Sequence, residues 1–292
     1  MPVKLDAVYT RTANGHTLNV YYDEMCDSPR EISEPLGKMI CWHRRYNLGD
    51  DHDYEYPEDL LKALLFSEYS SSPASQYGKP VYDFIKSGRA QDARLEYNRS
   101  TREWELLENQ HRTDNSGWYV SSSYPASLKG ADVPDWFLDD CLSALQIDER
   151  LSLVNGIEGM VILPLYLYDH SGITMNTYGF SCPWDSGMLG WITCEKKDIL
   201  ETYGSLSPKT IEQAKSCLQA EVEEYDHYLR GDCYGYQITD EYGEEVDSCW
   251  GFIGDLDDVK KWMQEQAPTE CECLFDENSA QSEDEAEWGD DD

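Results

Sequence analysis

Hydrophobic positions between Ser207 and Gly231 follow a helical period, and the rest of the chain is arranged around this stretch. Apolar residues recur there at steps of three and four, which places them on one face of a helix. They are Ile211, Ala214, Leu218, Val222, Tyr225 and Leu229. Ser207 is a typical N-cap, Pro208 suits the first helical position, and Gly231 can adopt the left-handed conformation that ends a helix. The pattern predicts one long amphipathic helix over 207–231.

The other face of this predicted helix is acidic. Its carboxylates belong to Glu212, Glu221, Glu223 and Glu224. We expect these four side chains to be exposed and to form part of a surface that binds a partner, because a row of carboxylates attracts basic groups.

Stretches on both sides of the helix have the alternation and composition of strands. Val8–Tyr22 is typical of a β-hairpin that turns at Asn14-Gly15. Further strands are expected at Met39–Arg44, Met160–Tyr168, Ile173–Tyr178, Leu189–Cys194, Cys233–Thr239 and Glu245–Phe252, and shorter helices after Pro57, after Pro134, at Lys196–Tyr203 and at Asp255–Gln266. The pattern over 93–107 fits a hairpin or a helix equally well. Together these elements predict an α+β fold with a mainly antiparallel sheet.

The length of 292 residues allows one large domain or two smaller ones. We expect an N-terminal α+β region over 1–150 and a C-terminal α+β region over 156–273, built around the long helix. Residues 274–292 are expected to form an acidic disordered tail, since the segment from Asp276 onward carries nine acidic residues and no basic one.

Net charge sets this sequence apart. The chain has 58 acidic residues against 23 basic ones, a net charge of -35. Residues 1–150 hold 26 acidic and 16 basic residues, and the remainder holds 32 and 7. Such a chain repels nucleic acid and anionic membranes and attracts basic surfaces. No apolar run approaches the ~20 residues of a membrane helix. Met1–Thr10 lacks the apolar core of a signal peptide, so we expect a cytosolic protein with reduced cysteines.

The motif SCPWDSG at Ser181–Gly187 is one candidate for chemistry. Cys182 would act as a nucleophile if His170 or His227 approached as a base, with Asp185 nearby as a further polar group. The alternative is a tight structural loop that seats Trp184 in the core.

The richest histidine and aspartate cluster follows the predicted strand at Met39–Arg44. It comprises His43, Asp50, Asp51, His52 and Asp53. These residue types could hold a hydrolytic metal, but the spacing matches no known ligand pattern such as HExxH, and a solvated loop explains them as well. Cys271 and Cys273 could bind zinc only if further ligands such as Cys233 or Cys249 joined them. We therefore assign no metal and no cofactor.

Several phrases resemble, together, a family of proteins carried by phages and mobile elements of Gram-positive bacteria. They are CDSPRE at Cys26–Glu31, CWHRRYNLGD at Cys41–Asp50, LPLYLYDHSGIT at Leu163–Thr174, SCPWDSG at Ser181–Gly187, and EYDHYLRGDCYGYQI with EVDSCWGFIG within Glu224–Gly254. The resemblance implies a phage or mobile-element setting inside a bacterial cell. It carries over no activity and no functional residue.

The sequence favours a binding protein over an enzyme. Its acidic surface would mimic the charge of DNA, which presents one negative charge per ~1.7 Å of axis, and would inhibit a host nucleic-acid-handling defence protein of the restriction or CRISPR type. The expected partner is the basic surface of that protein, with no direct contact to nucleic acid or membrane. Two alternatives remain open: a hydrolase or nuclease that uses Cys182, His170, Asp185, His43 or His52, and a module that binds a small ligand between aromatic walls.

Overall fold

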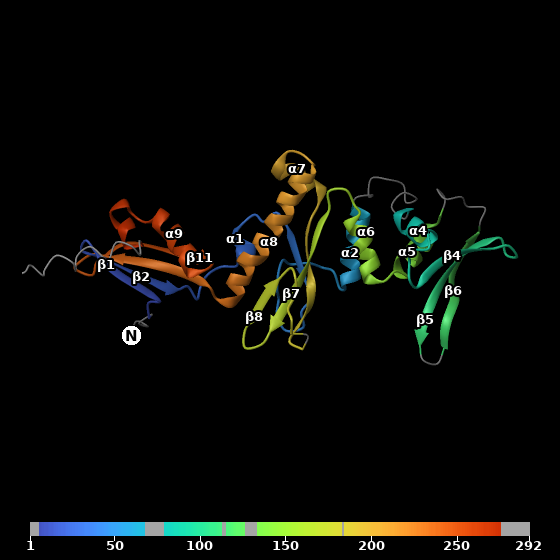
Figure 1. Cartoon of the computed structure of the whole chain (residues 1–292), viewed down its shortest axis with the longest axis horizontal. Coiled ribbons are helices and arrows are strands. Elements are labelled where there is room, and N and C mark those ends of the chain that lie inside the picture. Colours follow the sequence, from blue (N-terminus) through green and yellow to red (C-terminus); the bar gives the residue numbers. More distant parts are fainter. Residues whose placement is uncertain (1–5, 68–78, 113–114, 126–132, 183, 276–292) are drawn as a thin grey trace, which may run out of the picture. The chain divides into compact units, whose positions relative to one another are not determined.

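A computed structural model describes residues 6–67, 79–112, 115–125, 133–182 and 184–275 (Figure 1). The chain divides into two compact units. Unit 1 comprises Met1–Gly37, Pro164–Leu189 and Ser216–Asp292, and unit 2 comprises Lys38–Leu163 and Gly190–Lys215. The expected division into 1–150 and 156–273 does not coincide with these units, because the N-terminal strands pair with strands near the other end of the chain. The disordered tail was predicted over 274–292, but Leu274 and Phe275 are buried in the core, and the remainder from 276 onward lies outside the described residues.

Four antiparallel strands form the main sheet of unit 1 in the order β1-β2-β10-β11. They are β1 (Tyr9–Ala13), β2 (His16–Tyr22), β10 (Cys233–Thr239) and β11 (Glu245–Ile253). The hairpin predicted over Val8–Tyr22 is confirmed, and Asn14 and Gly15 both have positive φ at its turn (51° and 75°). Strand β2 pairs with β10 from Tyr22 opposite Tyr234 to Thr17 opposite Thr239.

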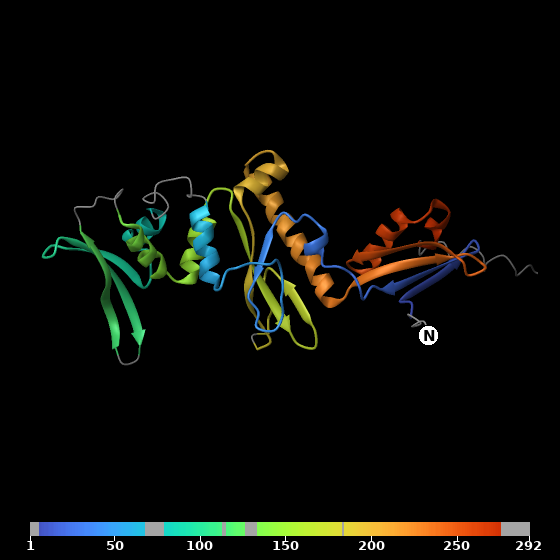
Figure 2. The ribbon, with the colours of Figure 1, turned by 180° about the vertical axis from the view of Figure 1, so that it is seen from behind.

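Helix α9 (Leu256–Gln266) covers one face of this sheet, as both ribbon views show (Figures 1 and 2). The short 3₁₀ helix η1 (Thr269–Leu274) packs against β1 and β2. Alternate strand residues and both helices supply the core of this layer: Leu18, Val20, Tyr234, Tyr236, Ile238, Val259, Met263, Cys271 and Leu274. The other face of the sheet carries polar side chains, such as the hydrogen-bonded pairs Thr10 with Asn19 and Thr12 with Thr17.

Helix α8 extends from Pro208 to Arg230. At its start Ser207 and Thr210 exchange hydrogen bonds, since the Ser207 backbone N–H donates to the Thr210 hydroxyl and the Thr210 N–H donates to the Ser207 hydroxyl. At its end Gly231 has φ 78° and the Asp232 N–H donates to the His227 carbonyl. Four residues of its apolar stripe are buried: Ala214, Leu218, Val222 and Tyr225.

A second sheet has the strand order β3-β9-β7-β8. Its strands are β3 (Lys38–Cys41), β7 (Val161–Asp169), β8 (Ile173–Asn176) and β9 (Ser186–Cys194). The boundary between the units passes through β7, β9 and α8. Within unit 2, β3 pairs with β9 from Lys38 opposite Thr193 to Cys41 opposite Gly190. Within unit 1, β7 pairs with β8, and His170-Ser171-Gly172 makes the connection.

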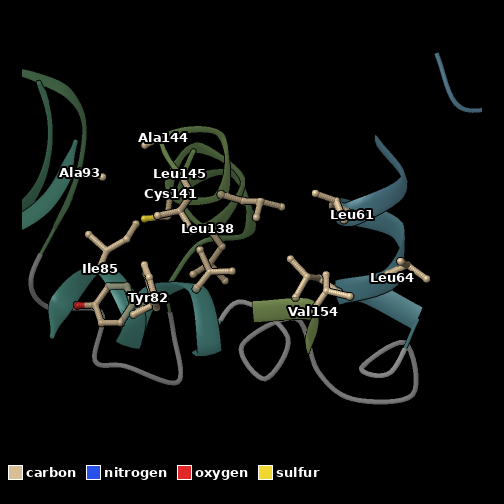
Figure 3. Close-up of a cluster of buried hydrophobic side chains, with 14 of the residues drawn as sticks. Leu61, Leu64, Tyr82, Ile85, Ala93, Leu138, Cys141, Ala144, Leu145 and Val154 are labelled. Carbon is tan, nitrogen blue, oxygen red and sulfur yellow. The ribbon is translucent and has the colours of Figure 1, made fainter. Parts of the chain in front are cut away.

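The rest of unit 2 combines a three-stranded meander with helices. The meander consists of β4 (Ala93–Asn98), β5 (Glu103–Arg112) and β6 (Asn115–Pro125), and the helices are α2 (Pro57–Ser67), α4 (Lys79–Lys86), α5 (Asp135–Ser143), α6 (Ile147–Asn155) and α7 (Lys196–Tyr203). The segment 93–107, left undecided by its periodicity, is a hairpin. Figure 3 shows Leu61, Tyr82, Ile85 and Cys141 in the buried cluster that joins these elements.

These elements make the chain an α+β protein with antiparallel sheets, as predicted. The region of the CDSPRE motif differs from a simple turn. Ser28 there caps a one-turn helix, α1 (Pro29–Ile32), by accepting a hydrogen bond from the Arg30 N–H.

Candidate functional site

The loop around Cys182 brings together three of the residues singled out from the sequence. The Cys182 thiol donates to Asp185 Oδ2 at 3.7 Å, and His170 Nδ1 lies 3.6 Å from the same oxygen. The loop is closed further by a hydrogen bond from the Asp169 N–H to the Asp185 carbonyl, at 2.8 Å. Cys182, His170 and Asp185 therefore lie together, within unit 1.

The geometry of this loop differs from that of a cysteine nucleophile. A nucleophilic thiol needs a base that takes its proton. Here the Cys182 thiol and the His170 imidazole both contact one oxygen of Asp185, and not each other. The His170 side chain is 63% exposed. His227, the other proposed base, belongs to a separate group, where its Nδ1 lies 3.1 Å from Asp232 Oδ2. The expectation that the loop seats Trp184 in the core is wrong, because Trp184 is 91% exposed.

The histidine and aspartate cluster after β3 is used for local structure. His43 Nδ1 accepts hydrogen bonds from the N–H groups of Arg45 and Tyr46, at 3.3 and 3.2 Å. His52 Nε2 donates to the Cys41 carbonyl at 2.9 Å, and Asp50 accepts from the Met39 N–H at 2.8 Å. These bonds hold the loop against its strand.

The remaining candidate metal ligands are also placed by the structure. Cys271 is buried, and the Cys273 sulfur accepts a hydrogen bond from the Asn14 amide at 3.3 Å. Across the part of the chain that the structure describes, no group of three His, Cys, Asp or Glu side chains is arranged to hold a metal ion.

The four glutamates predicted for the exposed face of α8 separate into two kinds. Glu212, Glu223 and Glu224 are exposed. Glu221 instead lies inside unit 1, where it pairs with Arg30 at 2.8 Å and accepts hydrogen bonds from the N–H groups of Leu36 and Gly37. Its role is to hold the N-terminal segment, so we remove Glu221 from the acidic surface. Glu212 belongs to unit 2, whereas Glu223 and Glu224 belong to unit 1.

Unit 1 contains a surface cavity of about 670 Å³ that sequence reasoning missed. We call it the Trp250 pocket. It is lined by Tyr22, Asp23, Glu24, Met25, Cys26, Asp27, Ile32, Trp250 and Gly251. Large apolar side chains are exposed around it: Met25 is 88% exposed, Ile32 60% and Trp250 45%. Exposed apolar groups inside a rim of carboxylates are typical of a binding site for a ligand or a protein partner.

The register of the sheet assembles this pocket. Trp250 is paired with Gly235 across β11 and β10, and its ring fills the space above that glycine: a Cβ at Gly235 would lie 2.1 Å from the indole Cε3. The Tyr21 ring stacks near it, with centroids 6.1 Å apart. Asp23 ties the other wall in place, because its carboxylate accepts from the Met25 N–H at 3.0 Å and from the Gly251 N–H at 3.1 Å.

Cys26, which lines the pocket, is hydrogen-bonded to the Cys233 thiol of β10. Burial raises the pKa of the Cys26 thiol, and a hydrogen bond from Cys233 opposes that shift. Burial raises the pKa of Cys233 to about 12. Both thiols are therefore protonated at neutral pH, which makes them weak nucleophiles and weak metal ligands.

The charge of the chain is concentrated in unit 1. That unit holds 33 acidic and 6 basic residues, a net charge of -27, whereas unit 2 holds 25 and 17, a net charge of -8. The sequence located the excess in the C-terminal half. The structure adds the N-terminal residues, with Glu24 and Asp27, to the same unit.

Comparison of the chain with family models, with curated proteins and with solved structures finds no match. Within the described residues, no helix has both the length and the apolar character needed to cross a membrane. The interpretation of the site therefore depends on its geometry and charge.

Proposed function

We propose that this protein binds a basic surface on a nucleic-acid-handling protein and prevents nucleic acid from reaching it. The observation that carries the proposal is the charge of the described part of unit 1, which holds 24 acidic and 5 basic residues, a net charge of -19. Basic grooves that bind nucleic acid attract any dense array of fixed negative charge, and an array on a folded surface loses less entropy on binding than a mobile one.

The exposed carboxylates of unit 1 supply the electrostatic part of this binding. Glu223 and Glu224 project from α8, and Glu241, Glu244 and Glu245 belong to the β10–β11 hairpin. Charges of this kind speed association and weaken with salt, since exposed charges are screened beyond about 8 Å at physiological ionic strength.

Aromatic side chains supply the contact part. Tyr22, Tyr242 and Trp250 are exposed on the same unit by 52%, 82% and 45%. Tyr and Trp are the side chains that most often anchor protein interfaces. An acidic surface with aromatic anchors thus combines attraction at a distance with specific packing on contact.

The resemblance to phage and mobile-element proteins suggests a biological role for this binding. In a bacterial cytosol, a protein that occupies the basic channel of a restriction or CRISPR nuclease would protect invading DNA. We propose that setting for this chain and an inhibitory, non-enzymatic role. The hydrolase alternative is less well supported, because Cys182 and His170 meet at Asp185 and do not form a nucleophile–base pair.

Capture from a Gram-positive bacterial lysate tests the proposal. The full-length protein is immobilised, and captured proteins are eluted with rising salt or with excess duplex DNA. We expect nucleic-acid-binding proteins that both treatments release. Captured proteins that resist both treatments, or that bind no nucleic acid, would contradict the proposed function.

A further inference from the structure

The Trp250 pocket has the chemistry of a receptor for one cationic side chain. We propose that it binds an arginine of the partner, an inference that rests on the proposed function and names the anchor of the contact. The pocket offers an indole face, apolar walls and carboxylates, which are the three features that match the guanidinium group and its aliphatic stem.

One carboxylate of the rim has a structural role, and two are exposed at the pocket. Asp23 is occupied by the N–H groups of Met25 and Gly251. Glu24 and Asp27 are exposed, and within the described residues neither carboxylate makes a hydrogen bond or an ion pair. They can therefore accept hydrogen bonds from a bound guanidinium group, which donates through as many as five N–H groups.

The apolar part of the pocket favours arginine over lysine. A guanidinium group is planar and weakly hydrated, so it stacks well on aromatic faces. An ammonium group is strongly hydrated and binds such faces less tightly. Trp250 is held flat above Gly235 beside Tyr21, and this keeps its ring in place as a platform. Met25 and Ile32 can cover the methylene groups of the stem. The volume of about 670 Å³ leaves room for the side chain and part of its backbone.

A titration followed by NMR tests this inference without a known partner. The full-length protein, labelled with ¹⁵N, is titrated with N-acetyl-arginine amide, with N-acetyl-lysine amide and with N-acetyl-norleucine amide. We expect the Trp250 indole signal to shift saturably with the arginine probe, with a dissociation constant about fivefold or more below that for the lysine probe. Trp262 is the internal control, because it is 47% exposed on α9 of the same unit and outside the pocket.

Two paired variants separate the pocket from the general charge of the unit. Glu24→Gln with Asp27→Asn should weaken arginine binding about tenfold, since two charge-assisted contacts are lost. Glu265→Gln with Glu270→Gln removes the same charge from exposed positions of unit 1 outside the pocket and should leave arginine binding unchanged.

Four results would overturn the inference: no shift of Trp250, equal shifts of Trp250 and Trp262, equal affinity for lysine, or equal affinity for norleucine. Equal affinity for lysine would indicate a site that recognises only a positive charge. Equal affinity for norleucine would indicate a purely apolar site. Failure of the proposed function would look different. The pocket would bind the arginine probe, yet no captured protein would be released by DNA.

Discussion

Arg30 and Glu221 form an ion pair at 2.8 Å between α1 and α8, and their side chains are only 4% and 13% exposed. Glu221 is also the acceptor for the N–H groups of Leu36 and Gly37 and for the Cys217 thiol. One carboxylate therefore fixes the N-terminal segment of unit 1 against its longest helix.

Glu221→Gln should destabilise the protein by about 3 kcal/mol or more, because it removes a charged partner from the buried Arg30 guanidinium. Urea unfolding followed by tryptophan fluorescence measures the change. Glu224→Gln is the matched control and should alter the free energy of unfolding by less than about 0.5 kcal/mol, since that side chain is exposed. Equal, small effects of the two changes would contradict the assigned role of Glu221.

The contact of Trp250 with Gly235 gives a second prediction. Gly235→Ala should cost about 1–3 kcal/mol, because the new methyl group overlaps the indole ring. In a Trp250→Ala background the same change should cost clearly less, since the ring that it meets is gone. A double-mutant cycle by chemical denaturation measures this coupling. Additive effects would mean that the ring does not lie over the glycine.

Alkaline pH should destabilise unit 1 through groups whose protons the fold retains. Burial raises the pKa of Cys233 and of Tyr234, each to about 12. The unfolded chain loses these protons near its ordinary pKa values of about 8.5 and about 10. Between those values and 12 the unfolded state binds fewer protons, so the free energy of unfolding falls as the pH rises.

Denaturation midpoints measured from pH 7 to pH 11 check this sign. Cys233→Ala should reduce the slope that begins near pH 9, by up to about 1.4 kcal/mol per pH unit. An unchanged slope in that variant would show that another group controls the alkaline transition.

Deleting residues 276–292 tests how much the folded surface contributes. The deletion removes nine carboxylates, and unit 1 then keeps 24 acidic against 6 basic residues. We expect association with a captured partner to slow modestly at low salt while dissociation and inhibition stay the same, because remote charge acts mainly on the association rate. Surface plasmon resonance separates the two rates. Complete loss of binding would place the interaction in the deleted segment.

Local signals predicted much of this fold. Asn14-Gly15 specified a hairpin, and Ser207 and Gly231 marked the ends of α8, since each of these preferences acts within a few residues. The pairing of β2 with β10 carries no local signal, so the two units could not be separated from the sequence. The β6 strand and the α4 and α6 helices were likewise not predicted.

The candidate site shows the same limit. Glu221 lies seven residues after Ala214 and four before Tyr225, and this spacing was a sign that it borders the buried stripe. Its partner Arg30 could not be named, because the contact is a product of tertiary structure. The Trp250 pocket combines residues after β2 with residues of β11, and only the strand register brings them together.

The central claim is that the carboxylates of unit 1 occupy a basic surface that otherwise binds nucleic acid. A competition titration tests it most directly: a captured partner is bound to labelled duplex DNA and displaced by wild-type protein or by one of two triple variants. The unit 1 variant carries Gln at Glu223, Glu224 and Glu241, and the unit 2 variant carries Gln at Glu55, Glu201 and Glu212. We predict that wild type displaces DNA, less well as ionic strength rises from about 0.05 to about 0.3 M, and that the unit 1 variant is weaker than the unit 2 variant. Salt-independent displacement, equal loss in the two variants, or no displacement would contradict the account.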